Sequence, residues 1–187
     1  RAGAQVTGID LTEYAILQTK KNFELRGLTP KAVLKMDAQK LDFPDNSFDF
    51  ISAHGCLMHM PDTQGAVKEM YRVLKPGGKI YVWMYNRGWY FWFNIIFKRG
   101  ILLGELFRNG FDVLKMTSKY TDGLPTGGNM HTKMFSRHGF QKLFERGGFS
   151  DITIVTNYNP NEWIYAWPMY KFPIGKFIPA VVRKFLS

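Results

Sequence analysis

The sequence predicts an α/β protein in which a mostly parallel sheet is covered by helices. Two observations carry this prediction. Strand-like and helix-like segments alternate through the first 85 residues, and the links between them are short. Alternation of this kind is typical of βα units around a parallel sheet. A length of 187 residues with 45% hydrophobic and 21% charged residues is enough for one soluble domain with a proper core.

The first unit of this pattern is a strand over residues 5–9 that is followed by Asp10. Thr12 is a suitable N-cap, because its hydroxyl can accept a hydrogen bond from a free amide in the first helical turn. The helix that it opens is expected to run to Leu25 and to stop near Gly27. A second strand over residues 32–36 then leads to Asp37.

A third strand is predicted over residues 48–53, after the turn-forming residues 44–47. Asp62 is expected to cap the clearest helix, in which Ala66, Val67, Met70, Val73 and Leu74 form one apolar stripe. Pro76-Gly77-Gly78 should end that helix before a fourth strand over residues 79–85. The link over residues 38–47 is short for a crossover, so we expect a loop there with one turn near residues 38–41.

The pattern changes after Tyr85. Residues 88–107 are aromatic and apolar, but Lys98, Arg99 and Glu105 interrupt them, which argues against a membrane span. Residues 115–133 have the composition of turns. Ser136 is expected to cap a helix that ends at Gly147-Gly148, and a fifth strand is predicted over residues 151–156. Three prolines in the tail exclude a long helix before Ile178.

Charge and aromatic residues gather in the second part of the chain. Of the net charge of +10, residues 1–85 carry +2 and residues 86–187 carry +8, and 21 of the 30 aromatic residues lie in the second part. A basic, aromatic surface suits an anionic partner such as a membrane surface or an acidic substrate, although a solvated face over an aromatic core is equally consistent. The single Cys56 excludes an internal disulfide and favours a reducing compartment.

Two acidic residues stand at predicted strand ends, where open parallel sheets bind their ligands. Asp10 follows the first strand and Asp37 follows the second. An acid in such a place can accept hydrogen bonds from both hydroxyls of a ribose. A simple helix cap is the alternative reading of each.

Four stretches together resemble a class I S-adenosylmethionine-dependent methyltransferase of the type 11 branch: VTGIDLT, MDAQKLDFPDNSFDFISAHGCLMHMPD, EMYRVLKPGGKIYVWMYNR and, more loosely, HTKMFSRHGFQKLFERGGFSDITIV. The resemblance implies a Rossmann-like, doubly wound sheet. It also implies one methyltransferase domain over residues 1–187 that is truncated at both ends, without the glycine-rich loop and the last strand of the family. Residues 86–133 would form a helical, aromatic insertion over the substrate.

The resemblance assigns roles to individual positions for the cofactor S-adenosyl-L-methionine. Asp10 would bind the ribose hydroxyls, and Leu11 would pack on the adenine. Asp37 would accept from the adenine amino group, while the Ala38 amide would donate to a ring nitrogen. His54 would lie beside the methionine part of the cofactor.

The candidate for a catalytic base is His59, which matches the second histidine of a His-His pair in the family, where Met58 replaces the first. A histidine can take a proton near neutral pH. A contact at the start of the next helix is the alternative role of His59, and His131 and Tyr85 are further candidates. No acid and histidine cluster has the spacing of metal ligands, so no metal is expected.

The predicted function is methyl transfer from S-adenosylmethionine to a small-molecule or lipid- or saccharide-linked acceptor, at oxygen. A nicotinamide-dependent oxidoreductase and a non-catalytic module of the same fold are the alternatives. Nucleic acid is disfavoured as a substrate, because the short motifs of base-modifying enzymes are missing after residue 53. The expected location is the cytoplasm, with peripheral membrane contact through the basic, aromatic part.

Overall fold

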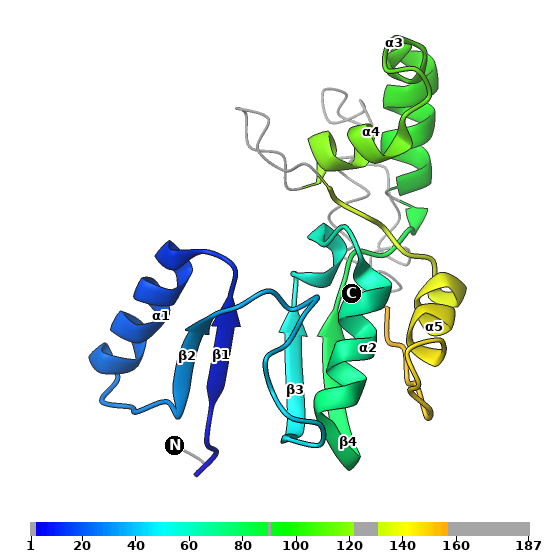
Figure 1. The fold of residues 1–187 in the computed structure, drawn as a ribbon. Helices are drawn as coiled ribbons and strands as arrows, with labels where there is room; N and C mark the ends of the chain where they lie inside the picture. Colours follow the sequence, from blue (N-terminus) through cyan, green and yellow to red (C-terminus); the bar gives the residue numbers. More distant parts are fainter. Residues whose placement is uncertain (1–2, 90, 122–130, 157–187) are drawn as a thin grey trace, which may run out of the picture. The chain divides into compact units, whose positions relative to one another are not determined.

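The structure is a computed structural model that describes residues 3–89, 91–121 and 131–156. The chain divides into two compact units. Of the described residues, the first contains 3–83 and 142–150, and the second contains 84–89, 91–121, 131–141 and 151–156. Each unit is described by itself. Figure 1 shows the elements in chain order from blue to yellow.

The first unit opens with a parallel pair of strands and one helix. Strand β1 (Thr7–Asp10) pairs with β2 (Ala32–Lys35), so that Asp10 lies opposite Lys35. Between them runs helix α1 (Glu13–Leu25), and the Thr12 hydroxyl accepts from the Ala15 amide as its N-cap. The helix ends where Gly27 takes a φ of 59°, which a residue without a Cβ adopts readily. The predicted cap and stop are therefore confirmed.

A second parallel pair is formed by β3 (Phe48–His54) and β4 (Leu74–Trp83), with helix α2 (Thr63–Val73) between them. The prediction of a helix end at Pro76-Gly77-Gly78 and a strand over residues 79–85 is corrected here. Leu74 already pairs with Phe48, and residues 75–78 form an irregularity before Lys79 pairs with Phe50. Gly77 takes a φ of 74° there, so the chain returns to extended backbone through a bulge.

The four strands confirm the α/β class with parallel pairing. Among the residues that the structure describes, they form two separate two-stranded sheets, β1–β2 and β3–β4. The link from β2 to β3 is a loop with one turn, in which the Lys40 amide donates to the Asp37 carbonyl. This agrees with the expectation for a link too short to hold a full helix.

The core of the first unit lies along α2. Its predicted stripe is confirmed, since Ala66, Val67, Met70 and Val73 are all buried. The end of helix α5 (Arg137–Glu145) lies beside α2, because Gln64 donates to the Leu143 carbonyl at 3.2 Å and the ring of Phe149 lies 5.2 Å from that of Tyr71. Gly147 is required here, because a Cβ at that position would lie 2.5 Å from Cγ1 of Val67.

The second unit is helical in its described part. It contains η2 (Phe91–Leu102, a π-helix), α3 (Glu105–Arg108) and α4 (Val113–Tyr120). Their shared core consists of Phe91, Ile95, Met116 and Met134. Helix α4 corrects the prediction of turns from residue 115, because Asp112 accepts from the Lys115 amide and opens a helix. Residues 122–130, where the turn-forming residues lie, are outside the described residues.

The C-terminal part of the described chain gives one confirmation and one correction. Ser136 accepts from the Gly139 amide at the start of α5, as predicted. Residues 151–156 are not a strand, although the sequence predicted one. A strand requires a hydrogen-bonded neighbour, and no described segment pairs with these residues. The predictions for the proline-rich tail fall on residues 157–187, outside the described residues.

Within residues 3–89, 91–121 and 131–156, no helix is long and apolar enough to cross a membrane.

Candidate functional site

Asp10 is the last residue of β1, and its exposed carboxylate forms hydrogen bonds through one of its two oxygens. Oδ1 accepts from both the amide and the hydroxyl of Thr12, each at 2.8 Å. The same hydroxyl caps α1, so the strand end, the turn and the helix start are tied together. Oδ2 accepts no hydrogen bond from any described residue. One carboxylate oxygen is therefore held by the fold and the other is open to a ligand.

Asp37 stands two residues beyond β2 with its carboxylate partly buried. Gln39 donates to Oδ1 through its amide at 2.9 Å and through Nε2 at 3.2 Å, and Nε2 also lies 3.1 Å from Oδ2. The neighbouring Ala38 amide donates to no described residue. An open acceptor and an open donor thus stand side by side, and this pattern is complementary to the amino group and adjacent ring nitrogen of an adenine.

The two acids belong to the same edge of the β1–β2 pair. Asp10 lies opposite Lys35, and the Met36 amide donates to the Asp10 carbonyl at 2.9 Å. Because the strands are parallel, their carboxyl ends lie together, as the strand-end rule requires. Leu11 follows Asp10 with 64% of its side chain exposed, which leaves an apolar surface available to a flat ring.

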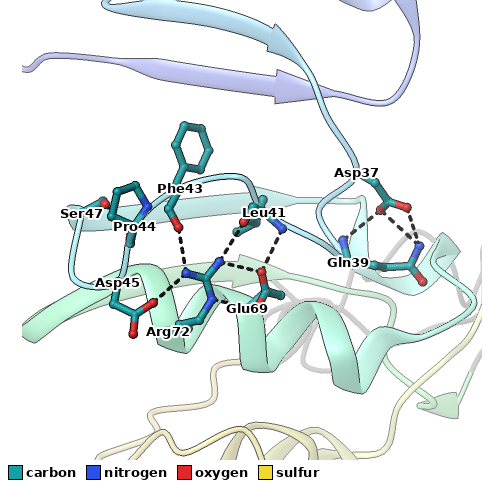
Figure 2. Close-up of polar contacts among 9 residues, drawn as sticks. All are labelled: Asp37, Gln39, Leu41, Phe43, Pro44, Asp45, Ser47, Glu69 and Arg72. Atoms are coloured by element: carbon teal, nitrogen blue, oxygen red, sulfur yellow. Dashed lines mark hydrogen bonds and ion pairs between the residues drawn. The ribbon is translucent and has the colours of Figure 1, made fainter.

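The loop that carries Asp37 is fastened to α2 by one arginine. Figure 2 shows Arg72 donating to the carbonyls of Phe43 and Leu41 and to the carboxylates of Asp45 and Glu69, at 2.7–2.8 Å. Glu69 also accepts from the Leu41 amide at 2.9 Å. The hydrogen bond from Arg72 lowers the pKa of Glu69, and the two carboxylates raise the pKa of Arg72. Sequence reasoning missed this network.

His54 is the last residue of β3 and its side chain is exposed. Its ring lies 4.8 Å from the ring of Tyr81, and the next residue, Gly55, takes a φ of 65°. Burial raises the pKa of the nearby Cys56 thiol, and the carboxylate of Asp10 adds a smaller effect in the same direction.

His59 closes η1 (Leu57–His59), three residues before the Asp62 cap of α2. Its amide donates to the Cys56 carbonyl at 3.1 Å, and its side chain is partly buried. Met58, which takes the place of a first histidine, is only 1% exposed. That position belongs to the core, so the residue in place of the first histidine has a packing role.

The other two candidates for a base lie in the second unit. Tyr85 packs against the cluster of Phe91, Ile95, Met116 and Met134, which supports a packing role. His131 precedes the buried Thr132, whose carbonyl accepts from Thr117. Among the described residues, no three histidine, cysteine or acidic side chains gather in a way that could hold a metal ion.

Part of the chain is similar to known methyltransferases. Residues 1–82 match the type 11 methyltransferase domain family. Over 84 residues the chain is 40% identical to sterol 24-C-methyltransferase of Aspergillus fumigatus, which covers 43% of this chain and 22% of that protein. Over 158 residues it is 26% identical to demethylmenaquinone methyltransferase of Geobacillus sp. (strain WCH70), which covers 80% of this chain and 62% of that protein.

A solved structure shows the same fold. A SAM-dependent methyltransferase from Methanosarcina mazei has a TM-score of 0.54 and 23% identity, over 78% of this chain and 69% of that one. Residues 1–82 therefore match a methyltransferase domain family, and the fold is that of the class I S-adenosylmethionine-dependent methyltransferases, which implies S-adenosyl-L-methionine as the cofactor. The chain spans less than two thirds of the length of the two curated relatives named above.

Proposed function

We propose that the protein transfers a methyl group from S-adenosyl-L-methionine to a small-molecule acceptor. The observation that carries this proposal is the polar edge of the β1–β2 pair. Oδ2 of Asp10 is open to accept from ribose hydroxyls, and Asp37 with the Ala38 amide presents the acceptor and donor that an adenine needs. Leu11 would pack on the base, and His54 would lie beside the methionine part.

Methyl transfer depends mainly on the correct position of the acceptor relative to the methyl group. The bound cofactor supplies an electrophilic methyl group, and its sulfur leaves as a neutral thioether, so no acid is needed on the leaving side. The protein must hold the acceptor atom in line with the methyl. For an oxygen acceptor, which we propose, the proton of the hydroxyl must also be removed. His59 is the proposed base, since it lies in the turn that follows the strand carrying His54.

Titration of the intact protein with S-adenosylmethionine and, separately, with NAD tests the proposal. We expect saturable binding of S-adenosylmethionine and none of NAD. Preference for NAD would favour a nicotinamide-dependent oxidoreductase. Binding of neither ligand would favour a non-catalytic module. Incubation with labelled cofactor and pooled small-molecule extracts would then show whether methyl groups reach a hydroxyl oxygen.

An apolar, membrane-derived acceptor is the finer part of the proposal. The names of the two curated relatives refer to sterol and demethylmenaquinone substrates. The second unit supports such a substrate, because six large apolar residues from η2 to the loop before α4 are 44–65% exposed: Phe97, Ile101, Leu102, Leu103, Phe107 and Phe111. We refer to these six residues as the exposed apolar set. Exposed apolar side chains in a basic region favour the interfacial zone of an anionic membrane.

A vesicle sedimentation assay tests the membrane contact. The intact protein should sediment with anionic vesicles, and the double substitution Phe107→Ser/Phe111→Ser should reduce the bound fraction several-fold. Tyr14→Ser is the matched control, since Tyr14 is an exposed aromatic residue of the first unit. Equal binding by all three proteins, or binding by none, would show that the exposed apolar set does not contact the membrane. Loss of binding in high salt would assign the contact to Lys and Arg instead.

A further inference from the structure

Gln39 lies near the start of the loop between β2 and β3, and its side chain contacts two functional segments at once. Nε2 donates to both carboxylate oxygens of Asp37, at 3.2 and 3.1 Å. On the other side, Oε1 accepts from the Asp62 amide at 2.8 Å. Figure 2 shows the first of these contacts, with the Gln39 side chain directed at Asp37. A partly buried amide therefore bridges the end of β2 and the start of α2.

The chemistry of the two partners fixes the orientation of this amide. A carboxylate can only accept and a backbone N–H can only donate. Nε2 must therefore face Asp37 and Oε1 must face Asp62, so the side chain cannot turn over without losing both contacts. The Asp62 amide in turn begins α2, whose first turn is closed by the hydrogen bond from Gly65 to the Asp62 carboxylate at 2.8 Å. The start of α2 therefore fixes the side-chain amide of Gln39, and this amide in turn fixes the carboxylate of Asp37.

The bridge also limits what Asp37 can still bind. A carboxylate offers about four acceptor positions. Gln39 fills two on Oδ1, through its amide and Nε2, and one on Oδ2. One position on Oδ2 remains, beside the open amide of Ala38. This arrangement suits a ligand edge that carries one N–H next to one acceptor nitrogen.

We propose that Gln39 is a positioning residue that sets the base specificity of the cofactor site. Gln39 orients the remaining acceptor position of Asp37 toward the amino group of adenine. Through Asp62, it also links this contact to the segment that contains His59. The inference rests on the proposed cofactor site and goes beyond it. A hypoxanthine ring would meet this edge with the wrong groups, because it carries an oxygen where adenine has the amino group and an N–H where adenine has a ring acceptor.

The test compares the affinity for S-adenosylhomocysteine with that for S-inosylhomocysteine, measured by calorimetry on the intact protein. Gln39→Met keeps the length of the side chain and removes its hydrogen bonds to both Asp37 and Asp62. We expect it to lower the preference for the adenine ligand by about tenfold, which is the scale of one hydrogen bond to a charged group. Gln39→Glu keeps the acceptor for Asp62 and places a second carboxylate beside Asp37, so it should lower the preference at least as far.

Gln18→Ala is the matched control, because Gln18 is an exposed glutamine of α1, and it should keep the preference of the wild type. An equal loss of both affinities in Gln39→Met would show that Gln39 only supports the loop, and the inference would fail. Tighter binding of S-adenosylhomocysteine by Gln39→Met would also overturn it, because Gln39 would then compete with the ligand for Asp37. If the wild type binds neither ligand, the proposed function fails together with the inference.

Discussion

At the scale of single residues, one carboxylate oxygen of Asp10 stabilises the fold and the other can bind a ligand. Oδ1 is held by Thr12 and Oδ2 is open within the described residues. Asp10→Ala should therefore weaken the binding of S-adenosylmethionine by about 1.5–3 kcal/mol, the range for hydrogen bonds to a charged group. Isothermal titration calorimetry of the intact protein measures this change.

A second aspartate provides the control for Asp10. Asp112 caps α4 in the second unit by accepting from the Lys115 amide at 2.9 Å. Asp112→Ala should cost about 1 kcal/mol of stability, as the loss of an N-cap usually does, and leave the affinity for the cofactor as it was. If both substitutions change the affinity equally, Asp10 acts only as part of a turn.

The sequence was sufficient to predict the strand-end acids but not their partners. Asp10 and Asp37 follow apolar runs, so their place at the carboxyl edge of parallel strands could be inferred from the pattern alone. Gln39 lies in a loop without periodicity, and its role depends on Asp62, 23 positions away. A contact of that kind has no local signal, because it exists only once β2 and α2 have been brought together.

At the scale of elements, Arg72 fastens the loop from Asp37 to Ser47 to α2, in addition to the hydrogen bonds within the loop itself. Arg72 reaches two carbonyls and two carboxylates from α2. Arg72→Met should lower the temperature of thermal unfolding and, because the same loop carries Asp37, weaken cofactor binding as well. Arg26→Met is the control, since among the described residues the side chain of Arg26 donates hydrogen bonds only to Asn22 of the neighbouring α1. Equal effects of the two substitutions would contradict the anchoring role.

The same network predicts how stability depends on pH. Arg72 lowers the pKa of Glu69 in the folded state, so the unfolded chain takes up this proton first as the pH falls. The contribution of Glu69 is therefore present above the ordinary pKa of a glutamate, about 4.3, and is lost below it. Urea unfolding midpoints between pH 6 and pH 3 should fall less steeply for Glu69→Gln than for the wild type.

Asp49 supplies the comparison for this pH dependence. Its pKa is also lowered, by Lys75, but the pair is exposed, and exposed ion pairs contribute little to stability. Asp49→Asn should leave the slope of the midpoints against pH nearly unchanged. A larger change from Asp49→Asn than from Glu69→Gln would show that the network around Arg72 is not the source of the acid sensitivity.

Elements with a cap and an apolar stripe could be predicted from sequence, whereas elements that depend on a distant partner could not. Helices α1, α2 and α5 begin after Thr12, Asp62 and Ser136, and each of these residues caps its helix as expected. Residues 151–156 have the composition of a strand but find no pairing neighbour in the described chain. The π-helical winding of η2 was not predicted, because five adjacent aromatic residues leave no clear 3.6-residue stripe.

At the scale of the whole molecule, the chain consists of two compact units, each with its own core. The core of the first unit includes Leu57, and that of the second includes Ile95, and both side chains are 0% exposed. The change from α/β alternation to a helical, aromatic segment after Tyr85 was visible in the sequence. The described boundary at Trp83 lies close to this change, but the return of residues 142–150 to the first unit was not predicted.

Because each unit has its own core, a destabilising substitution in one unit should increase hydrogen exchange in that unit alone. Leu57→Ala and Ile95→Ala each remove a fully buried side chain, which typically costs about 2–5 kcal/mol. Hydrogen exchange followed by mass spectrometry should show faster exchange in residues 48–83 for Leu57→Ala and in residues 91–120 for Ile95→Ala. Each variant should leave the other range as protected as in the wild type, because each unit has its own buried core. Faster exchange across both ranges in either variant would mean that the two cores unfold as one.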